Sequence, residues 1–85
     1  MKESTIKLID EHLQKARNKY PVFPCMLTET VSIAAEELGE FAQAINDYFA
    51  ADLKGYKLKK KLADKIKSKA LDLIVLMVRH IEGDC

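Results

Sequence analysis

The sequence predicts an all-α fold, and two observations carry this prediction. Apolar residues recur at the three- and four-residue spacing of helices in three separate segments, and no segment alternates as a half-buried strand does. We therefore expect residues 1–85 to form one helical domain, whose core is thin because so small a domain buries only about 60–65% of its unfolded surface.

The first predicted helix ends before Pro21 and Pro24, since proline cannot continue a helix and restricts the residue before it. Its apolar stripe contains Ile6, Ile9, Leu13, Ala16 and Tyr20. The second predicted helix runs from about Leu27 to Ala51, with Thr28 as the expected N-cap. The stripe of this helix consists of Val31, Ala35, Leu38, Ala42, Ile45 and Phe49.

The third predicted helix runs from about Lys57 to Glu82, after a turn at Gly55. Its stripe contains Leu58, Leu62, Ile66, Leu73, Met77 and Ile81. Between Ala70 and Val78 every residue except Asp72 is apolar, which indicates burial on all sides. A monomer of three helices cannot easily surround one of them in this way. In addition, 48% of the residues are hydrophobic, which is a high share for so short a chain. We therefore expect a homodimer or tetramer in which two copies share a four-helix-type core.

Charge is distributed unevenly along a chain whose net charge is only +1. Neither lysine nor arginine occurs between Lys19 and Lys54, whereas lysines crowd the segment from Lys54 to Lys69. The simplest interpretation of the lysines is a solvated helix face, and contact with phosphate or nucleic acid is the alternative. Because the lysine run from Lys57 to Lys69 has no interleaved aromatic residues for base stacking, we expect nucleic acid not to be the partner.

The chain shows no sign of a membrane or export signal. Its N-terminus lacks the apolar core of a signal peptide, and no run approaches the roughly 18 apolar residues of a membrane span. Cys25 and Cys85 lack the spacing of a zinc site or a disulfide framework. We expect a cytoplasmic protein that does not contact a membrane.

Three glutamates of the second helix share one face. Glu36, Glu37 and Glu40 lie within an arc of about 100°, and no basic residue of that helix offsets their repulsion. If the second and third helices form an antiparallel hairpin, residues at equal height have numbers that sum to about 109, because each helix rises about 1.5 Å per residue. Glu37 then lies level with Asp72, and Glu40 with Lys69.

Carboxylates that converge on rigid helices suit a hard divalent cation such as Mg²⁺, which removes both their repulsion and the cost of burying Asp72. Two plainer interpretations stay open. The glutamates can form a solvated acidic face, and Asp72 can form a hydrogen bond or an ion pair with Lys69 or Arg79.

The segment Glu36-Glu37-Leu38-Gly39-Glu40, followed after a spacer by Asp72 at the head of Leu73-Ile74-Val75, resembles the MazG-like all-α nucleoside triphosphate pyrophosphohydrolases. The pattern of that family is E-E-x-x-E, a spacer and E-x-x-D, and the resemblance extends over about residues 28–81. It implies a dimeric four-helix core and a Mg²⁺-dependent hydrolysis of canonical or aberrant nucleoside triphosphates to monophosphate and pyrophosphate, of the house-cleaning type.

The resemblance also implies roles for individual residues. Glu37, Glu40 and Asp72 would be magnesium ligands, and Glu36 would be a supporting or second-metal carboxylate, so that these four acids form the catalytic set. A water molecule activated by metal and carboxylate would attack phosphorus. Substrate phosphates would contact lysines, for which Lys65 and Lys69 are the candidates. Base recognition would fall at the subunit interface, near Phe23, Phe41, Tyr48 or Phe49.

Lys69 departs from the family pattern, because it stands where the first acid of E-x-x-D belongs and an ammonium cannot bind a cation. Three interpretations follow. Three carboxylates hold one Mg²⁺ while Lys69 points aside or toward substrate phosphate; Lys69 takes the place of the metal by pairing with Glu40; or a partner chain supplies the missing acid. The second describes a non-catalytic helical module that binds a nucleotide or nucleic acid, and it is the alternative to the enzyme.

Overall fold

The computed structural model describes residues 1–51 and 56–84, except for the side chains of residues 56 and 57. Within these ranges the chain forms three α-helices and no strand, which confirms the all-α prediction. The helices are α1 (Glu3–Lys19), α2 (Leu27–Ala50) and α3 (Tyr56–Ile81). The turn expected at Gly55 and the thiol of Cys85 lie outside the described residues.

The prediction that Thr28 caps α2 is wrong. Met26 is the N-cap, and it makes no side-chain capping bond. The carbonyl oxygen of Met26 accepts hydrogen bonds from the amide of Thr30 at 3.1 Å and from its hydroxyl at 3.3 Å, so the first helical turn already includes Thr28.

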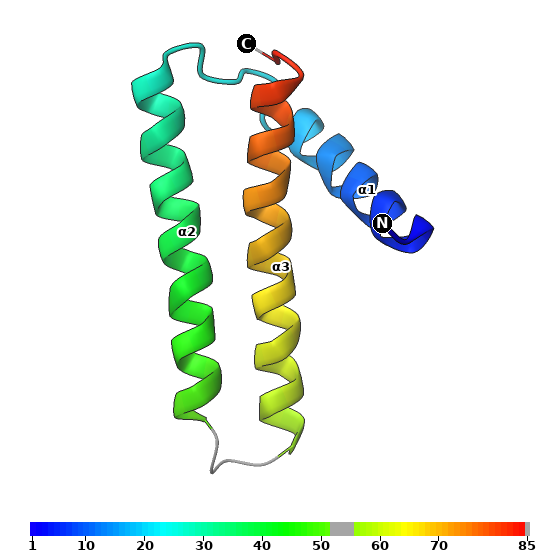
Figure 1. The fold of residues 1–85 in the computed structure, drawn as a ribbon, viewed down its shortest axis with the longest axis vertical. Helices are drawn as coiled ribbons and strands as arrows, with labels where there is room; N and C mark the ends of the chain where they lie inside the picture. Colours follow the sequence, from blue (N-terminus) through cyan, green and yellow to red (C-terminus); the bar gives the residue numbers. More distant parts are fainter. Residues whose placement is uncertain (52–55, 85) are drawn as a thin grey trace.

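α3 is the central helix of the fold. Figure 1 shows α2 and α3 side by side with opposite chain directions, while α1 lies obliquely along the other side of α3, near its C-terminal end. Within the described ranges α1 packs against α3 and not against α2. The connector, residues 20–26, passes from α1 to the start of α2 around the C-terminal end of α3.

The core is thin, as the chain length predicts. Its buried apolar residues come from all three helices and the connector, and they are Leu13, Phe23, Ala44, Ala51, Val75 and Leu76. Among the described residues no large side chain is buried to more than 98%. Ion pairs outside the core, at the C-terminal end of α3, therefore also hold the single chain together.

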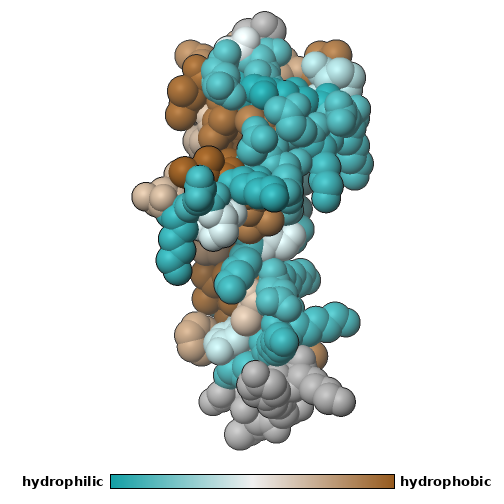
Figure 2. Space-filling model, turned by 90° about the vertical axis from the view of Figure 1, so that its right-hand side faces the viewer, coloured by the Kyte–Doolittle hydropathy of each residue, from teal (hydrophilic) through white to brown (hydrophobic). Residues whose placement is uncertain are grey.

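The apolar stripe predicted for α2 is largely exposed in the single chain. Val31, Leu38 and Phe49 are 67%, 54% and 68% exposed, whereas Thr30 and Ala44, on another face of the helix, are buried. α2 carries apolar residues on two faces, and the pattern alone does not say which of them packs within the chain. Figure 2 shows hydrophobic side chains gathered along one side of the molecule, next to a largely hydrophilic face.

The apolar part of α3 is likewise not surrounded. Val75 and Leu76 are buried, but Ile74 and Met77 are 40% and 37% exposed. The reason is that α1 and α2 pack against only part of the surface of α3. Among the described residues no helix is long and apolar enough to cross a membrane.

A group of ion pairs fastens the C-terminal end of α3 to α1, and we name Arg17, Arg79 and Asp84 the C-terminal clamp. Arg17 donates from Nε to Asp84 Oδ2 at 2.9 Å, and the buried Arg79 donates from Nε to the same oxygen at 2.8 Å. Arg79 also donates from Nη2 to the carbonyl oxygen of Tyr20 at 2.8 Å, and its guanidinium lies 4.8 Å from the centre of the Phe23 ring. The clamp thus joins α1, the connector and α3.

Gly83 makes this geometry possible. Its φ is +71°, a conformation that favours glycine, and the turn it forms after α3 lets the amide of Asp84 donate to the carbonyl oxygen of Arg79 at 3.1 Å. The chain therefore turns back and carries the Asp84 carboxylate to both arginines.

Candidate metal centre

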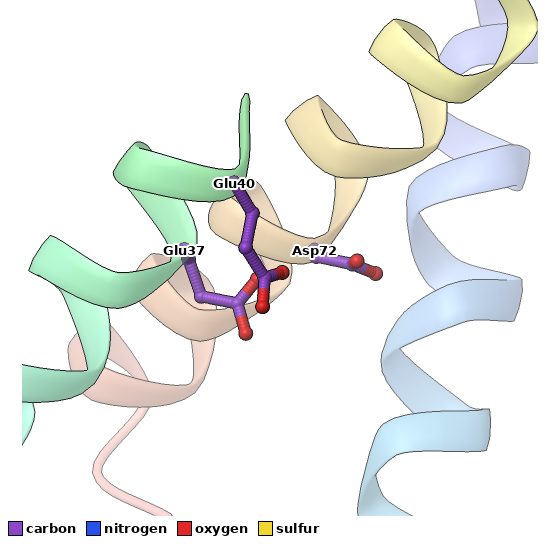
Figure 3. Close-up of side chains that lie close together, drawn as sticks. All are labelled: Glu37, Glu40 and Asp72. Atoms are coloured by element: carbon purple, nitrogen blue, oxygen red, sulfur yellow. The ribbon is translucent and has the colours of Figure 1, made fainter. Parts of the chain in front are cut away.

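Three carboxylates from two helices meet at the middle of the α2–α3 contact. One oxygen each of Glu37, Glu40 and Asp72 lies within 4.8 Å of the other two. Glu37 and Glu40 share a face of α2 because they are three residues apart, and Asp72 reaches them from α3. Figure 3 shows the two glutamates next to each other and Asp72 extending toward α1. We name these residues the carboxylate cluster.

Glu37 is the residue of the cluster whose charge is least satisfied. Its Oε2 is buried and has no hydrogen-bond partner. Burial raises the pKa of Glu37 above its usual value, and the neighbouring carboxylates of Glu40 and Asp72 raise it further. A buried carboxylate oxygen without a donor costs about 1–3 kcal/mol. The donor set and the unsatisfied oxygen fit a hard divalent cation, which binds carboxylate oxygens.

Asp72 is more exposed than its apolar surroundings in the sequence imply. Its side chain is 44% exposed, so the expectation of a buried acid is wrong. Asp72 lies in the open space between α1 and α2, because among the described residues α1 packs against α3 and not against α2, and it does not close over the cluster. Water therefore reaches Asp72, and its burial does not by itself call for a cation.

Lys69 is paired with the cluster. Its Nζ lies 3.1 Å from Glu40 Oε2 and 4.0 Å from Asp72 Oδ2. The hydrogen bond to Glu40 raises the pKa of Lys69, which keeps its ammonium charged. The prediction that Glu40 and Lys69 lie at the same height on α2 and α3 is thus confirmed. This geometry matches the interpretation in which Lys69 takes the place of a metal, although it leaves Glu37 Oε2 without a donor.

Glu36 and Lys65 lie apart from the cluster. Glu36 is exposed and is not among the described residues that converge, because its position on α2 is about 100° around the helix from Glu37. Lys65 is exposed and forms no ion pair with any residue in the described ranges. The proposed roles of these two residues stay predictions.

A groove of about 600 Å³ opens beside the cluster, between α1, the connector, α2 and α3, and we name it the α1 groove. Glu37 and Asp72 line it on one side, and the basic residues His12, Lys15 and Lys19 line it from α1. Sequence reasoning missed the α1 residues. No spacing could have found them, because their distance from the acids depends on how α1 packs on α3.

The aromatic residues proposed for base recognition do not gather at this groove. Phe23 lines it but is buried beneath Arg79. Tyr48 lies eleven residues beyond Glu37, about 16 Å along α2, and Lys59 Nζ lies 4.4 Å from the centre of its ring. Tyr20, which is 58% exposed, is the aromatic side chain that the groove presents to solvent.

Comparison of the chain with protein-family models, with curated proteins and with solved structures finds no match. The resemblance to the MazG-like family therefore stays a prediction from the residue pattern.

Proposed function

We propose that the chain is a Mg²⁺-dependent nucleoside triphosphate pyrophosphohydrolase whose ion is held by Glu37, Glu40 and Asp72. The observation that carries the proposal is the buried, unpartnered Oε2 of Glu37 within a cluster of three carboxylates. The pattern E-E-x-x-E followed by Asp72 supports it, as does a groove with a basic wall directly beside the acids.

The residues of the groove suit the parts of such a substrate. Lys15 and Lys19 offer ammonium groups to phosphate oxygens, and Tyr20 offers an exposed ring on which a base can stack. Mg²⁺, when bound, would neutralise phosphate charge and lower the pKa of a water molecule. A carboxylate of the cluster would take the proton from the attacking water. A new P–O bond forms as the bridging P–O bond breaks, and pyrophosphate leaves with the electron pair.

We also propose that a second copy of the chain covers the exposed apolar side chains of α2 and α3. Val31, Leu38 and Phe49 lie within about 20° of one another around α2, and Glu40 projects about 180° away from them. A second copy on that face would complete a four-helix core without covering the carboxylate cluster. Ile74 and Met77 of α3, which are partly exposed in the single chain, are the residues that α3 would contribute.

The alternative is a non-catalytic helical module that binds a nucleotide or another anion. The ion pair between Lys69 and Glu40 favours it, because this ammonium already supplies part of the positive charge that the cluster needs. The two functions make different predictions for turnover.

We expect purified protein to release pyrophosphate from at least one member of a panel of canonical and damaged nucleoside triphosphates in the presence of Mg²⁺, and from none in EDTA. Asp72→Asn should lower the rate by about 10–100-fold or more, since even residues that only support a metal ligand cost this much. Asp64→Asn is the matched control, because Asp64 is an exposed acid of α3 outside the cluster. It should leave the rate unchanged.

Two other outcomes are informative. If the natural chain is inactive and Lys69→Glu turns over, the chain is a non-catalytic relative whose missing acid accounts for its inactivity. If neither protein releases pyrophosphate from any nucleotide of the panel, the enzyme proposal is wrong.

A further inference from the structure

We propose that Lys69 is an internal counter-ion that competes with a divalent cation for Glu40 and Asp72, so that the ion binds only when the ammonium leaves. The inference rests on the proposed metal site, and it names a side chain that regulates how strongly that site binds its ion. It concerns affinity for the ion, and it can be tested without turnover.

The first step of the argument is the position of the ammonium. Lys69 Nζ lies 3.1 Å from Glu40 Oε2 and 4.0 Å from Asp72 Oδ2, while oxygens of these two acids and of Glu37 lie within 4.8 Å of one another. The ammonium therefore occupies the space next to the atoms that a cation would bind. Two positive charges a few ångströms apart repel strongly in a partly buried site, so they cannot both be accommodated.

The second step is that the ammonium satisfies the cluster incompletely. It reaches Glu40 and Asp72, but Glu37 Oε2 stays buried without a hydrogen-bond partner. A divalent cation carries twice the charge and accepts several oxygen ligands at once, so it can satisfy the third carboxylate as well. The ion pair is thus a partial substitute for the ion.

The third step is that Lys69 can leave at low cost. Its side chain is 27% exposed, and an ammonium on a flexible stem is readily solvated by water. The net affinity for the ion then equals the intrinsic affinity of the carboxylates reduced by the free energy of breaking the Lys69 contacts. One side chain sets how strongly the natural protein loads metal.

The test is calorimetric titration of the full chain with MnCl₂ and with MgCl₂. Lys69→Met keeps an unbranched stem and removes the charge, and we expect it to tighten binding by about tenfold. Lys67→Met is the matched control, since it removes an equal charge from an exposed position of α3 outside the cluster. Its dissociation constant should equal that of the natural chain.

Thermal unfolding gives a second measurement. Without metal, Lys69→Met should unfold at a lower temperature than the natural chain, because the carboxylates lose their counter-ion. With the same saturating Mn²⁺ concentration it should gain more stability than the natural chain gains, because the stabilisation by a ligand grows with the logarithm of its affinity. If Lys69→Met does not fold, as judged by circular dichroism, Lys69→Gln replaces it in both measurements.

If Lys69→Met binds metal and the natural chain does not, the inference is supported, because the ammonium then excludes the ion completely. Equal affinities of the natural chain and Lys69→Met would overturn the competition and leave the metal site intact. An equal gain in Lys67→Met would also overturn it, because the effect would then reflect overall charge. If none of these proteins, nor Lys69→Glu, binds either metal, the proposed function fails together with this inference.

Discussion

Glu37 carries a charge that works against folding of the metal-free chain. Its Oε2 has no donor, and the pKa of Glu37 is raised by burial and by the acids beside it. A carboxyl whose pKa is higher in the folded than in the unfolded state penalises folding at pH values above the folded pKa. The penalty disappears as the pH falls below the pKa of the unfolded chain.

We therefore expect Glu37→Gln to stabilise the metal-free protein at pH 7 by about 1 kcal/mol, since it removes a partly buried charge with one unpartnered oxygen and the repulsion of that charge with two acids. The difference should shrink toward pH 4, where Glu37 itself becomes protonated. Urea unfolding in EDTA at both pH values measures it. Glu36→Gln is the control at the adjacent exposed glutamate and should change stability little. A Glu37→Gln protein less stable than the natural chain at pH 7 would mean that Glu37 has a donor in solution.

At the scale of residues, the sequence predicts which side chains of α2 and α3 meet, but it does not predict how exposed those side chains are. The pairing of Glu40 with Lys69 follows from helical rise alone, and so does the meeting of Glu37 with Asp72. The exposure of Asp72 does not follow from the sequence, because it depends on where α1 leaves α3 uncovered.

At the scale of elements, the position of α1 depends on the C-terminal clamp. The hydrogen bond from Arg17 lowers the pKa of Asp84 to about 2, and Arg79 contributes to the same shift. A carboxyl with a lowered pKa stabilises the fold above its unfolded pKa of about 3.8, and the contribution is lost as the pH falls through about 2. The clamp should thus hold α1 against α3 at neutral pH and release it in strong acid.

We expect Asp84→Asn to lower the melting temperature at pH 7 by several degrees, and the difference from the natural chain should vanish as the pH falls through about 2, where Asp84 loses its charge. Hydrogen exchange should become faster in α1 and stay unchanged in the middle of α2, because α1 contacts α3 and not α2 in the part of the chain that the structure describes. Asp10→Asn, at an exposed acid of α1 outside the clamp, is the control. Unchanged exchange in α1 of Asp84→Asn would show that apolar contacts such as that of Leu13 hold the helix by themselves.

The helices themselves were predictable to within one or two residues at most ends, because apolar spacing and the two prolines act locally. The placement of α1 was not predictable. Its single buried residue, Leu13, and its salt bridges to the C-terminal turn identify its neighbour only once the chain is folded. The α1 groove, which depends on that placement, was missed for the same reason.

At the scale of the whole molecule, the exposed apolar side chains of α2 are the main feature that one chain leaves without a partner. Leu38 is 54% exposed in the middle of this face, between Val31 and Phe49. Several large apolar side chains on one helix face of a small protein favour a protein contact. The dimer proposed above would remove them from water.

We expect light scattering after gel filtration to give the mass of a dimer for the natural chain and that of a monomer for Leu38→Glu, because a charge cannot be buried at the interface without a partner. Gln43→Glu adds the same charge to a position about 140° around α2 from Leu38, and this control should stay dimeric. A natural chain that is monomeric at micromolar concentration would contradict the proposal.

The sequence by itself determined the number of helices, their approximate bounds and the residues that lie level on α2 and α3. These properties depend on the period and rise of the helix, which each segment carries within itself. Only the tertiary structure decided which of two apolar faces of α2 packs against α3, that Asp72 faces the α1 groove, and that Lys69 already pairs with the acids. Those properties depend on packing between segments, and several arrangements of amphipathic helices satisfy the same pattern of apolar residues.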